Sequence, residues 1–242
     1  MNRQDETGSP TRCEIEWHEG DMPYSPEFGD HFYSRSDGRS ECEHVFINGN
    51  DLPGRWPENN SFTVAELGFG TGLNFCETWR RWNEIRGSDG HLLFVSFEKF
   101  PLRGAEIARA LSVWPDLDDF SRQLTGHWPE NPPGSVRIDF DDCIALELHV
   151  GDALQCLSLW QDQADAWYLD GFAPDRNPDM WSSELLRQVY DHTVPGGSFA
   201  TYSAAGWVRR NLEAAGFNVE KRQGYAGKRE MCTGGRALTD TA

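Results

Sequence analysis

The chain has 242 residues, 38% of them hydrophobic, and its 10 Trp and 14 Phe residues are enough for one sizeable core. No apolar run approaches the roughly 20 residues that cross a bilayer, and the first ten residues are polar, so we expect a cytoplasmic protein without a membrane span or secretory signal. With 39 Asp and Glu residues against 22 Lys and Arg residues, the net charge of −17 argues at first sight against a polyanionic partner.

From residue 62 onward, short apolar runs alternate with longer amphipathic stretches. This alternation predicts a Rossmann-like α/β fold, in which helices cover a mostly parallel sheet. We expect seven strands, at residues 62–67, 92–98, 146–150, 166–170, 198–202, 217–222 and 229–232. The expected helices lie at residues 72–85, 102–110, 152–161, 182–192 and 204–215, and Gly216 is placed to end the last of them.

The N-terminal part follows a different pattern. Turn residues such as Asn48-Gly49-Asn50 and short aromatic runs such as residues 44–47 predict a few antiparallel strands before residue 60. Residues 114–134 are rich in Trp, Pro and Asp and are expected to form an insertion with irregular or short helical structure. We therefore divide the chain into an N-terminal extension (1–60) packed on the core, a catalytic domain (61–235) and a short tail (236–242).

The cysteines and histidines do not indicate a metal site. The six cysteines are scattered without a close pair of the kind that binds zinc or forms a redox dithiol, and the seven histidines show no short ligand spacing. We interpret the cysteines as reduced packing residues and expect no metal.

The most specific local pattern is the string Glu-Leu-Gly-Phe-Gly-Thr-Gly-Leu-Asn at residues 66–74, directly after a predicted strand and at the start of a predicted helix. Glycines allow a tight turn and a close approach of the backbone to a ligand, and the helix N-terminus favours electron-rich groups. The spacing differs from that of a dinucleotide-binding loop, because Gly72 follows Gly70 after one residue instead of two. No Gly-Lys-Ser/Thr follows to make a P-loop.

Three acidic residues end successive predicted strands. Glu66, Glu98 and Asp152 would meet at the edge of the sheet where open α/β folds bind ligands. Each alone is more often a cap or turn residue, but their joint placement with the glycine loop favours a nucleoside cofactor with a positively charged sulfur. Such a cofactor calls for carboxylates near its methionine end, its ribose and its adenine.

The fourth predicted strand leads into residues 167–181, a string rich in aromatic residues and prolines. Asp170 is expected beside the methyl group of the cofactor, and Phe172 and Pro174 offer apolar surfaces on which a flipped base could stack. Because an amine must lose a proton before it can be methylated, Asp170 is the candidate base. The alternative is a Pro-rich turn in which Asp170 only caps the next element.

Several strings together resemble one family, the methyltransferase part of the bacterial tRNA 5-methylaminomethyl-2-thiouridine biosynthesis protein (MnmC-type). The matching residues are 66–75, 96–101, 169–174, 177–181, 195–197, 205–210 and 227–231, and the resemblance runs from about residue 17 to residue 232.

The resemblance implies a class I methyltransferase that transfers a methyl group from S-adenosylmethionine to the 5-aminomethyl group of a wobble uridine, often 2-thiolated. It implies that Asp170 acts in catalysis. The cofactor would be bound by Glu66, Gly68, Phe69, Gly70, Thr71, Gly72, Asn74, Glu98, Lys99, Asp152 and Ala153. The substrate would be bound by Asp170, Gly171, Phe172, Pro174, Asn177, Lys228 and Arg229, the last two as phosphate or anticodon-loop contacts.

Two further expectations concern partners. Between residues 207 and 236, seven basic residues face three glutamates, so this acidic chain has a local positive segment that could meet tRNA phosphates or be an ordinary solvated surface. No second glycine fingerprint follows, so we expect no flavin oxidase activity, a monomer, and a separate enzyme that supplies the aminomethyl intermediate. Two alternatives stay open at this point, namely a methyltransferase for a small amine or another RNA, and a non-catalytic RNA-binding module.

Overall fold

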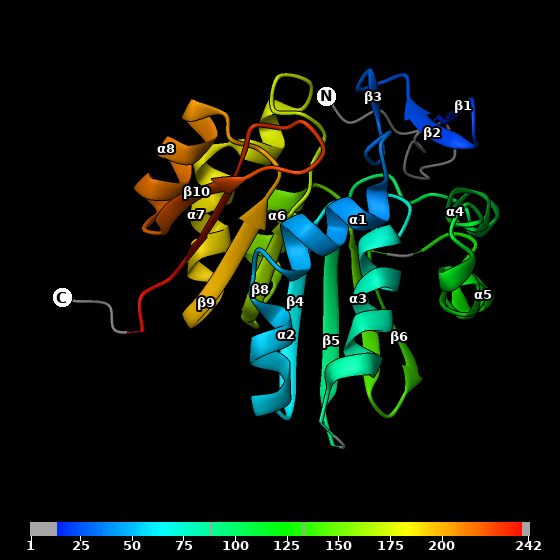
Figure 1. Cartoon of the computed structure of the whole chain (residues 1–242), viewed down its shortest axis with the longest axis horizontal. Coiled ribbons are helices and arrows are strands. Elements are labelled where there is room, and N and C mark those ends of the chain that lie inside the picture. The colour runs from blue at the N-terminus through cyan, green and yellow to red at the C-terminus, as the bar shows by residue number, and fades with distance from the viewer. Residues whose placement is uncertain (1–13, 88, 133, 239–242) are drawn as a thin grey trace.

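The computed structural model describes residues 14–87, 89–132 and 134–238. Its centre is an eight-stranded sheet in the order β10-β11-β9-β8-β4-β5-β7-β6 (Figure 1). The strands are β4 (Ser61–Leu67), β5 (His91–Glu98), β6 (Ser135–Asp141), β7 (Ile144–Val150), β8 (Ala164–Leu169), β9 (Thr193–Thr201), β10 (Asn218–Gln223) and β11 (Glu230–Gly235).

The predicted α/β fold with a mostly parallel sheet is confirmed. The five strands from β9 to β7 pair in parallel, whereas β11 runs antiparallel to both β9 and β10. The predicted number of strands was one too low, because β6 pairs antiparallel with β7 at the edge of the sheet. Only Ile138 of β6 is buried, and the apolar residues Val136, Ile138 and Phe140 alternate with polar ones, whereas the other strands were predicted from short apolar runs.

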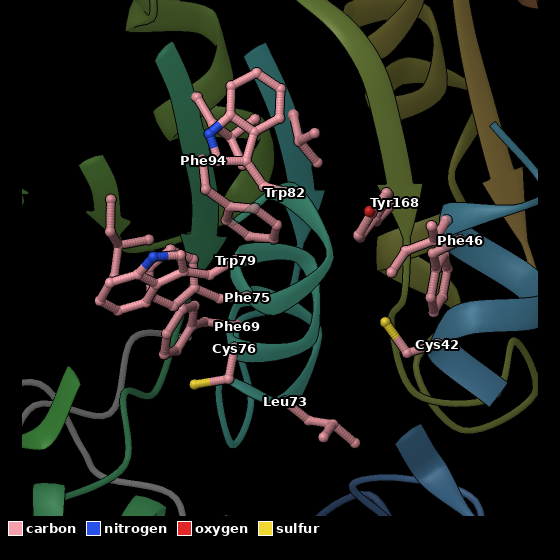
Figure 2. Packing of buried hydrophobic residues seen from close by; sticks show 14 of the residues in the cluster. Cys42, Phe46, Phe69, Leu73, Phe75, Cys76, Trp79, Trp82, Phe94 and Tyr168 are labelled. Carbon is pink, nitrogen blue, oxygen red and sulfur yellow. The ribbon is translucent and has the colours of Figure 1, made fainter. Parts of the chain in front are cut away.

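Helices cover both faces of the sheet. The longer ones are α3 (Leu73–Ile85), α4 (Gly104–Leu111), α5 (Asp118–His127), α6 (Ala153–Leu159), α7 (Ser183–Asp191) and α8 (Gly206–Ala215). Side chains of β8 alternate between two cores: Tyr168 packs on the face that carries α3, and Trp167 packs on the face that carries α6 to α8. Figure 2 shows Tyr168 beside Phe46, with ring centroids 5.0 Å apart. Phe75 of α3 contacts Phe94 of β5, with ring centroids 5.3 Å apart.

The N-terminal segment contains the predicted antiparallel strands, but not where residues 44–47 had indicated. A three-stranded antiparallel sheet is formed by β1 (Glu16–His18), β2 (Met22–Ser25) and β3 (Asp30–His31). Residues 44–47 were wrongly predicted as a strand, since they belong to helical turns made by α1 (Gly38–Cys42) and the π-helix η1 (Glu43–Ile47). Val45, Phe46 and Ile47 are all buried, and so short an apolar run cannot distinguish a strand from a buried helix.

The remaining short elements complete the covering of the sheet. After η1 come α2 (Leu52–Arg55) and the 3-10 turn η2 (Trp56–Glu58), and residues 114–134 hold η3 (Pro115–Leu117) as well as α5. Trp128 stacks on Phe69 with ring centroids 5.0 Å apart, so this segment packs directly against the glycine loop. A further 3-10 turn, η4 (Pro178–Trp181), precedes α7. The division of the chain at residues 60 and 235 stays a prediction.

Within the described ranges, no helix is both long and apolar enough to span a membrane. The same residues contain no cluster of His, Cys, Asp or Glu suited to a metal ion. Cys42, Cys76, Cys143, Cys156 and Cys232 are free thiols, whereas Cys13 lies outside the described residues.

Candidate active site

A cavity of about 630 Å³ opens at the carboxyl ends of the central strands β4, β5, β7 and β8. This is the edge at which open α/β sheets bind ligands, because the loops that follow parallel strands meet there. One wall is made by the glycine loop after β4 and the turns after β5 and β7. The opposite wall comes from residues between Glu27 and Phe46 in the N-terminal segment.

The glycine loop has the backbone that its sequence predicts. Gly68, Gly70 and Gly72 have φ values of 91°, 53° and 75°, in the left-handed region that favours glycine. A Cβ atom on Gly68 would lie 3.1 Å from the carbonyl oxygen of Asp170, so this position also needs glycine for space. Gly72 is buried at the start of α3 and does not line the cavity, whereas Phe69 and Thr71 do.

The acidic residues after β5 and β7 reach the cavity wall. Glu98 Oε2 accepts a hydrogen bond from the Gly70 backbone N–H at 3.0 Å, and Oε1 accepts one from the Phe100 N–H at 2.7 Å. Asp152 caps α6 by accepting a hydrogen bond from the Gln155 N–H at 3.3 Å. Lys99 and Ala153 also line this side. Glu98 therefore fixes the glycine loop relative to the end of β5.

Glu66 lies beneath the cavity and does not form part of its wall. Its side chain is fully buried, and its two oxygens accept hydrogen bonds from Asn74 Nδ2 at 2.8 Å and from Ser96 Oγ at 3.0 Å. Burial, together with the nearby charge of Asp170, raises the pKa of Glu66 well above its usual range. The alternation of side chains along β4 directs Glu66 under α3, and that arrangement was not anticipated from its position at the end of the strand.

Asn74 joins Glu66 to Asp170. The same Nδ2 atom donates a second hydrogen bond to Asp170 Oδ2 at 2.6 Å. Burial raises the pKa of Asp170 to about 7, and the charge of Glu41 acts in the same direction, while the hydrogen bond from Asn74 and the charge of Lys228 favour the carboxylate. A carboxyl group in this state can accept and return a proton near neutral pH.

Beyond Asp170, an aromatic cluster lines the cavity. Phe172 stacks on Phe28 with ring centroids 4.6 Å apart and meets Phe32 edge-on at 5.3 Å. Asp30 Oδ2 accepts a hydrogen bond from the Ala173 N–H at 3.2 Å, which ties the N-terminal segment to this loop. Gly171 and Asn177 line the cavity, but Pro174 is buried behind it.

The predicted basic pair is divided by the structure. Lys228 points into the cavity, where its Nζ atom lies 2.6 Å from Glu41 Oε1 and 4.2 Å from the centre of the Tyr202 ring. Arg229 is exposed and does not line the cavity. Four further lining residues carry no motif of their own and were not predicted, namely Glu41, Tyr202, Asp30 and Phe32. The aromatic residues 31–33 were the only available sign that this part of the chain contributes to a site.

The arrangement combines a backbone loop open to close approach, carboxylates along one wall, and a buried carboxyl group poised to exchange a proton. A model of the S-adenosyl-L-methionine-dependent methyltransferase family matches residues 115–237. The chain belongs to this family. Its cofactor is therefore S-adenosylmethionine.

Individual relatives and structures agree with this membership. The methyltransferase is 44% identical over 233 residues to the tRNA 5-methylaminomethyl-2-thiouridine biosynthesis bifunctional protein MnmC of Methylobacillus flagellatus, an alignment that covers 95% of this chain and 36% of that protein. It is 43% identical to the protein of the same name from Chromohalobacter salexigens, over 91% of this chain and 32% of that one. The chain thus spans about a third of the length of these relatives.

Among solved structures, the crystal structure of MNMC2 from Aquifex aeolicus is similar with a TM-score of 0.76 at 20% sequence identity. The superposition covers 95% of this chain and 71% of that chain. At this identity the likeness concerns the fold, which includes the N-terminal segment as well as the central sheet.

Proposed function

We propose that this methyltransferase transfers a methyl group from S-adenosylmethionine to the 5-aminomethyl group of uridine or 2-thiouridine at the wobble position of tRNA. The names of its relatives indicate this chemistry, and the observation that carries the proposal is the placement of Asp170. Asp170 follows β8, its backbone carbonyl group lies beside Gly68, and its side chain lines the cavity, where burial raises the pKa of the carboxyl group to about 7. An amine acceptor needs a base of this kind next to the methyl donor.

The cofactor would be held by the loop from Gly68 to Thr71 and by the carboxylates of Glu98 and Asp152. When bound, S-adenosylmethionine supplies an electrophilic methyl group on a positively charged sulfur. The cavity suits such a group, since Gly68 and Gly70 permit close backbone approach and the acidic side chains complement a cation. In this proposal Glu66 does not touch the cofactor but orients Asn74, and through it Asp170.

Asp170 would first accept a proton from the aminomethyl ammonium group, which frees the lone pair of the nitrogen. The lone pair would then face the methyl group that S-adenosylmethionine supplies, and that group would pass to the nitrogen while the electron pair of the broken carbon–sulfur bond stays on sulfur. Positioning of nitrogen, carbon and sulfur in line would provide most of the remaining rate acceleration. Phe172, with Phe28 and Phe32, would offer an aromatic surface for the uracil ring.

Recognition of tRNA has electrostatic support despite the acidic composition. Arg35 lines the cavity, Arg176 precedes the lining residue Asn177, and Arg229 follows Lys228. All three are exposed, and no ion pair with a carboxylate involves them in the described part of the chain. Such arginines are free to meet phosphates around the cavity mouth. Action on tRNA also makes a cytoplasmic location part of this proposal, together with a separate source of the aminomethyl group.

The test is incubation of the protein and S-adenosylmethionine with tRNA that carries the 5-aminomethyl group, followed by mass spectrometry of the nucleosides. We expect methylaminomethyluridine to form, and Asp170→Ala to keep saturable cofactor binding, weakened by less than about tenfold because the carboxylate beside the positive sulfur is gone, but to lose most of its turnover. Absence of the methylated nucleoside with the wild-type protein would refute the proposal. Methylation of small amines at a comparable rate would favour the alternative of a small-molecule enzyme.

A further inference from the structure

A second carboxylate shares the cavity with Asp170. Glu41 belongs to α1, its residue surface is only 8% exposed, and it lines the cavity although no motif surrounds it. It lies close enough to Asp170 for its charge to affect the ionisation of that carboxyl group. A buried carboxylate at this place needs a cationic partner, because an unpaired buried charge is costly.

The partner of Glu41 is itself a primary alkylammonium group. Lys228 Nζ donates to Glu41 Oε1 at 2.6 Å and lies 4.2 Å above the Tyr202 ring, whose hydroxyl group donates to the Gly171 carbonyl oxygen at 2.7 Å. Glu41 and the face of the Tyr202 ring thus already hold one alkylammonium group, that of Lys228, next to Gly171.

The second oxygens of the two carboxylates remain for a ligand. Within the described residues, no hydrogen bond reaches Glu41 Oε2 or Asp170 Oδ1, whereas Glu41 Oε1 and Asp170 Oδ2 are taken by Lys228 and Asn74. Neither oxygen is among the buried polar atoms that lack a partner, so both have access to the cavity or solvent. An ammonium group has three N–H donors, and these two oxygens can accept two of them.

We propose that Glu41 is a second acceptor-binding carboxylate, and that Glu41 and Asp170 together restrict the enzyme to one methyl transfer per amine. This inference rests on the proposed function, since it names how the same site selects its acceptor and its product. Glu41 positions the amine through one N–H group and does not take up its proton. Lys228 pairs with Glu41 Oε1 and so fixes this side chain in the cavity wall.

The count of hydrogens explains the restriction. The primary ammonium binds with one N–H on each carboxylate. Its third proton passes to Asp170, directly or through water, and from there to solvent, which restores the Asp170 carboxylate, and the resulting lone pair turns toward the methyl donor. The product is a secondary ammonium with two N–H groups, both of which are held by the two carboxylates. A second transfer would require the new methyl group to replace one N–H on a buried carboxylate, which leaves that oxygen without its donor.

The experiment compares wild-type protein with Glu41→Gln on tRNA that carries the 5-aminomethyl group, with S-adenosylmethionine in excess. For wild type we expect one methyl group on the amine even after long incubation. For Glu41→Gln we expect the Michaelis constant for tRNA to rise by about tenfold, as for the loss of one charge-assisted hydrogen bond, and a dimethylated nucleoside to accumulate. Glu43→Gln is the matched control, since Glu43 pairs with Arg81 outside this cavity, and it should behave as wild type.

Folding of each variant is checked by thermal melting and by its affinity for S-adenosylmethionine. If Glu41→Gln is unfolded, Glu41→Asp gives a second route, because it keeps the charge that Lys228 needs but withdraws the oxygen from the amine; dimethylation is expected here too. A Glu41 variant that folds, keeps the wild-type Michaelis constant and adds only one methyl group would overturn the inference alone. Wild-type protein that leaves the aminomethyl group unmethylated would overturn the proposed function, and the inference with it.

Discussion

Replacement of Asn74 by Leu tests the proton-transfer role of Asp170 through its nearest hydrogen-bond donor. Asn74 Nδ2 lies 2.6 Å from Asp170 Oδ2, and a hydrogen bond to a charged group contributes about 1.5 to 3 kcal/mol. If about 1.4 kcal/mol of this favours the carboxylate over the acid, its loss raises the midpoint of the pH–rate profile by about one pH unit, from about 7 to about 8. The ionised fraction at neutral pH then falls from about one half to about one tenth.

Single-turnover methyl transfer to aminomethyl tRNA, measured from about pH 6 to about pH 9, checks this expectation. The rate of Asn74→Leu should be roughly fivefold lower than wild type near pH 7 and should recover at the alkaline end. Ser96→Ala is the matched control, because Ser96 donates to Glu66 but not to Asp170, and its midpoint should stay in place. An Asn74→Leu profile with the wild-type midpoint, or an equal rate loss at every pH, would refute the reasoning.

Three further expectations concern stability and RNA binding. The pKa of Asp170 rises from 3.8 to about 7 on folding, so between these values the folded protein keeps a proton that the unfolded chain has lost, and stability falls as the pH rises. Asp170→Asn should therefore raise the free energy of unfolding, measured by urea titration, by about 2 kcal/mol or more at about pH 8 but not at about pH 4. Gly68→Ala, with φ at 91°, should lower stability by about 1 to 2 kcal/mol in thermal melting and weaken cofactor binding in calorimetry. Gly87→Ala should do neither, because a Cβ atom there would meet only the Pro57 carbonyl oxygen, at 4.0 Å, and its φ is not positive. Joint replacement of Arg35, Arg176 and Arg229 by Ala should reduce the slope of log affinity for tRNA against log salt by about 2, as expected for about three lost phosphate contacts, and an unchanged slope would exclude these arginines from the interface. The control for charge replaces three exposed arginines that are already paired with aspartates, namely Arg122, Arg137 and Arg187.

The central sheet and the glycine loop could be predicted because their determinants are local. Helix α3 begins one residue after its predicted start, since Gly72 supplies the left-handed backbone that precedes it. The apolar runs of β4 and β5 likewise give their strands to within one residue. The edge strand β6 was missed because its apolar residues, Val136, Ile138 and Phe140, alternate with polar ones, whereas the strands were predicted from short apolar runs.

The walls of the cavity could not be predicted because their contacts are long-range. Lys228 and Glu41 lie 187 positions apart, and no local pattern around Glu41 indicates that it will meet a lysine from the β10–β11 loop. The contribution of the N-terminal segment to the site could therefore be seen only in the folded structure. The strand-end rule placed Glu98, Asp152 and Asp170 at the cavity, but it misplaced Glu66, whose face of β4 is set by the period-two alternation of that strand.

The central claim is that the cofactor binds with its positive charge beside Asp170, and calorimetry in two buffers of different ionisation enthalpy tests it most directly. Binding of a cation next to this carboxyl group favours its ionised form, so near pH 7 wild-type protein should bind S-adenosylmethionine and release a fraction of a proton. Asp170→Asn should bind the cofactor without that release. Absence of saturable binding, or an equal proton release from Asp170→Asn, would contradict the account.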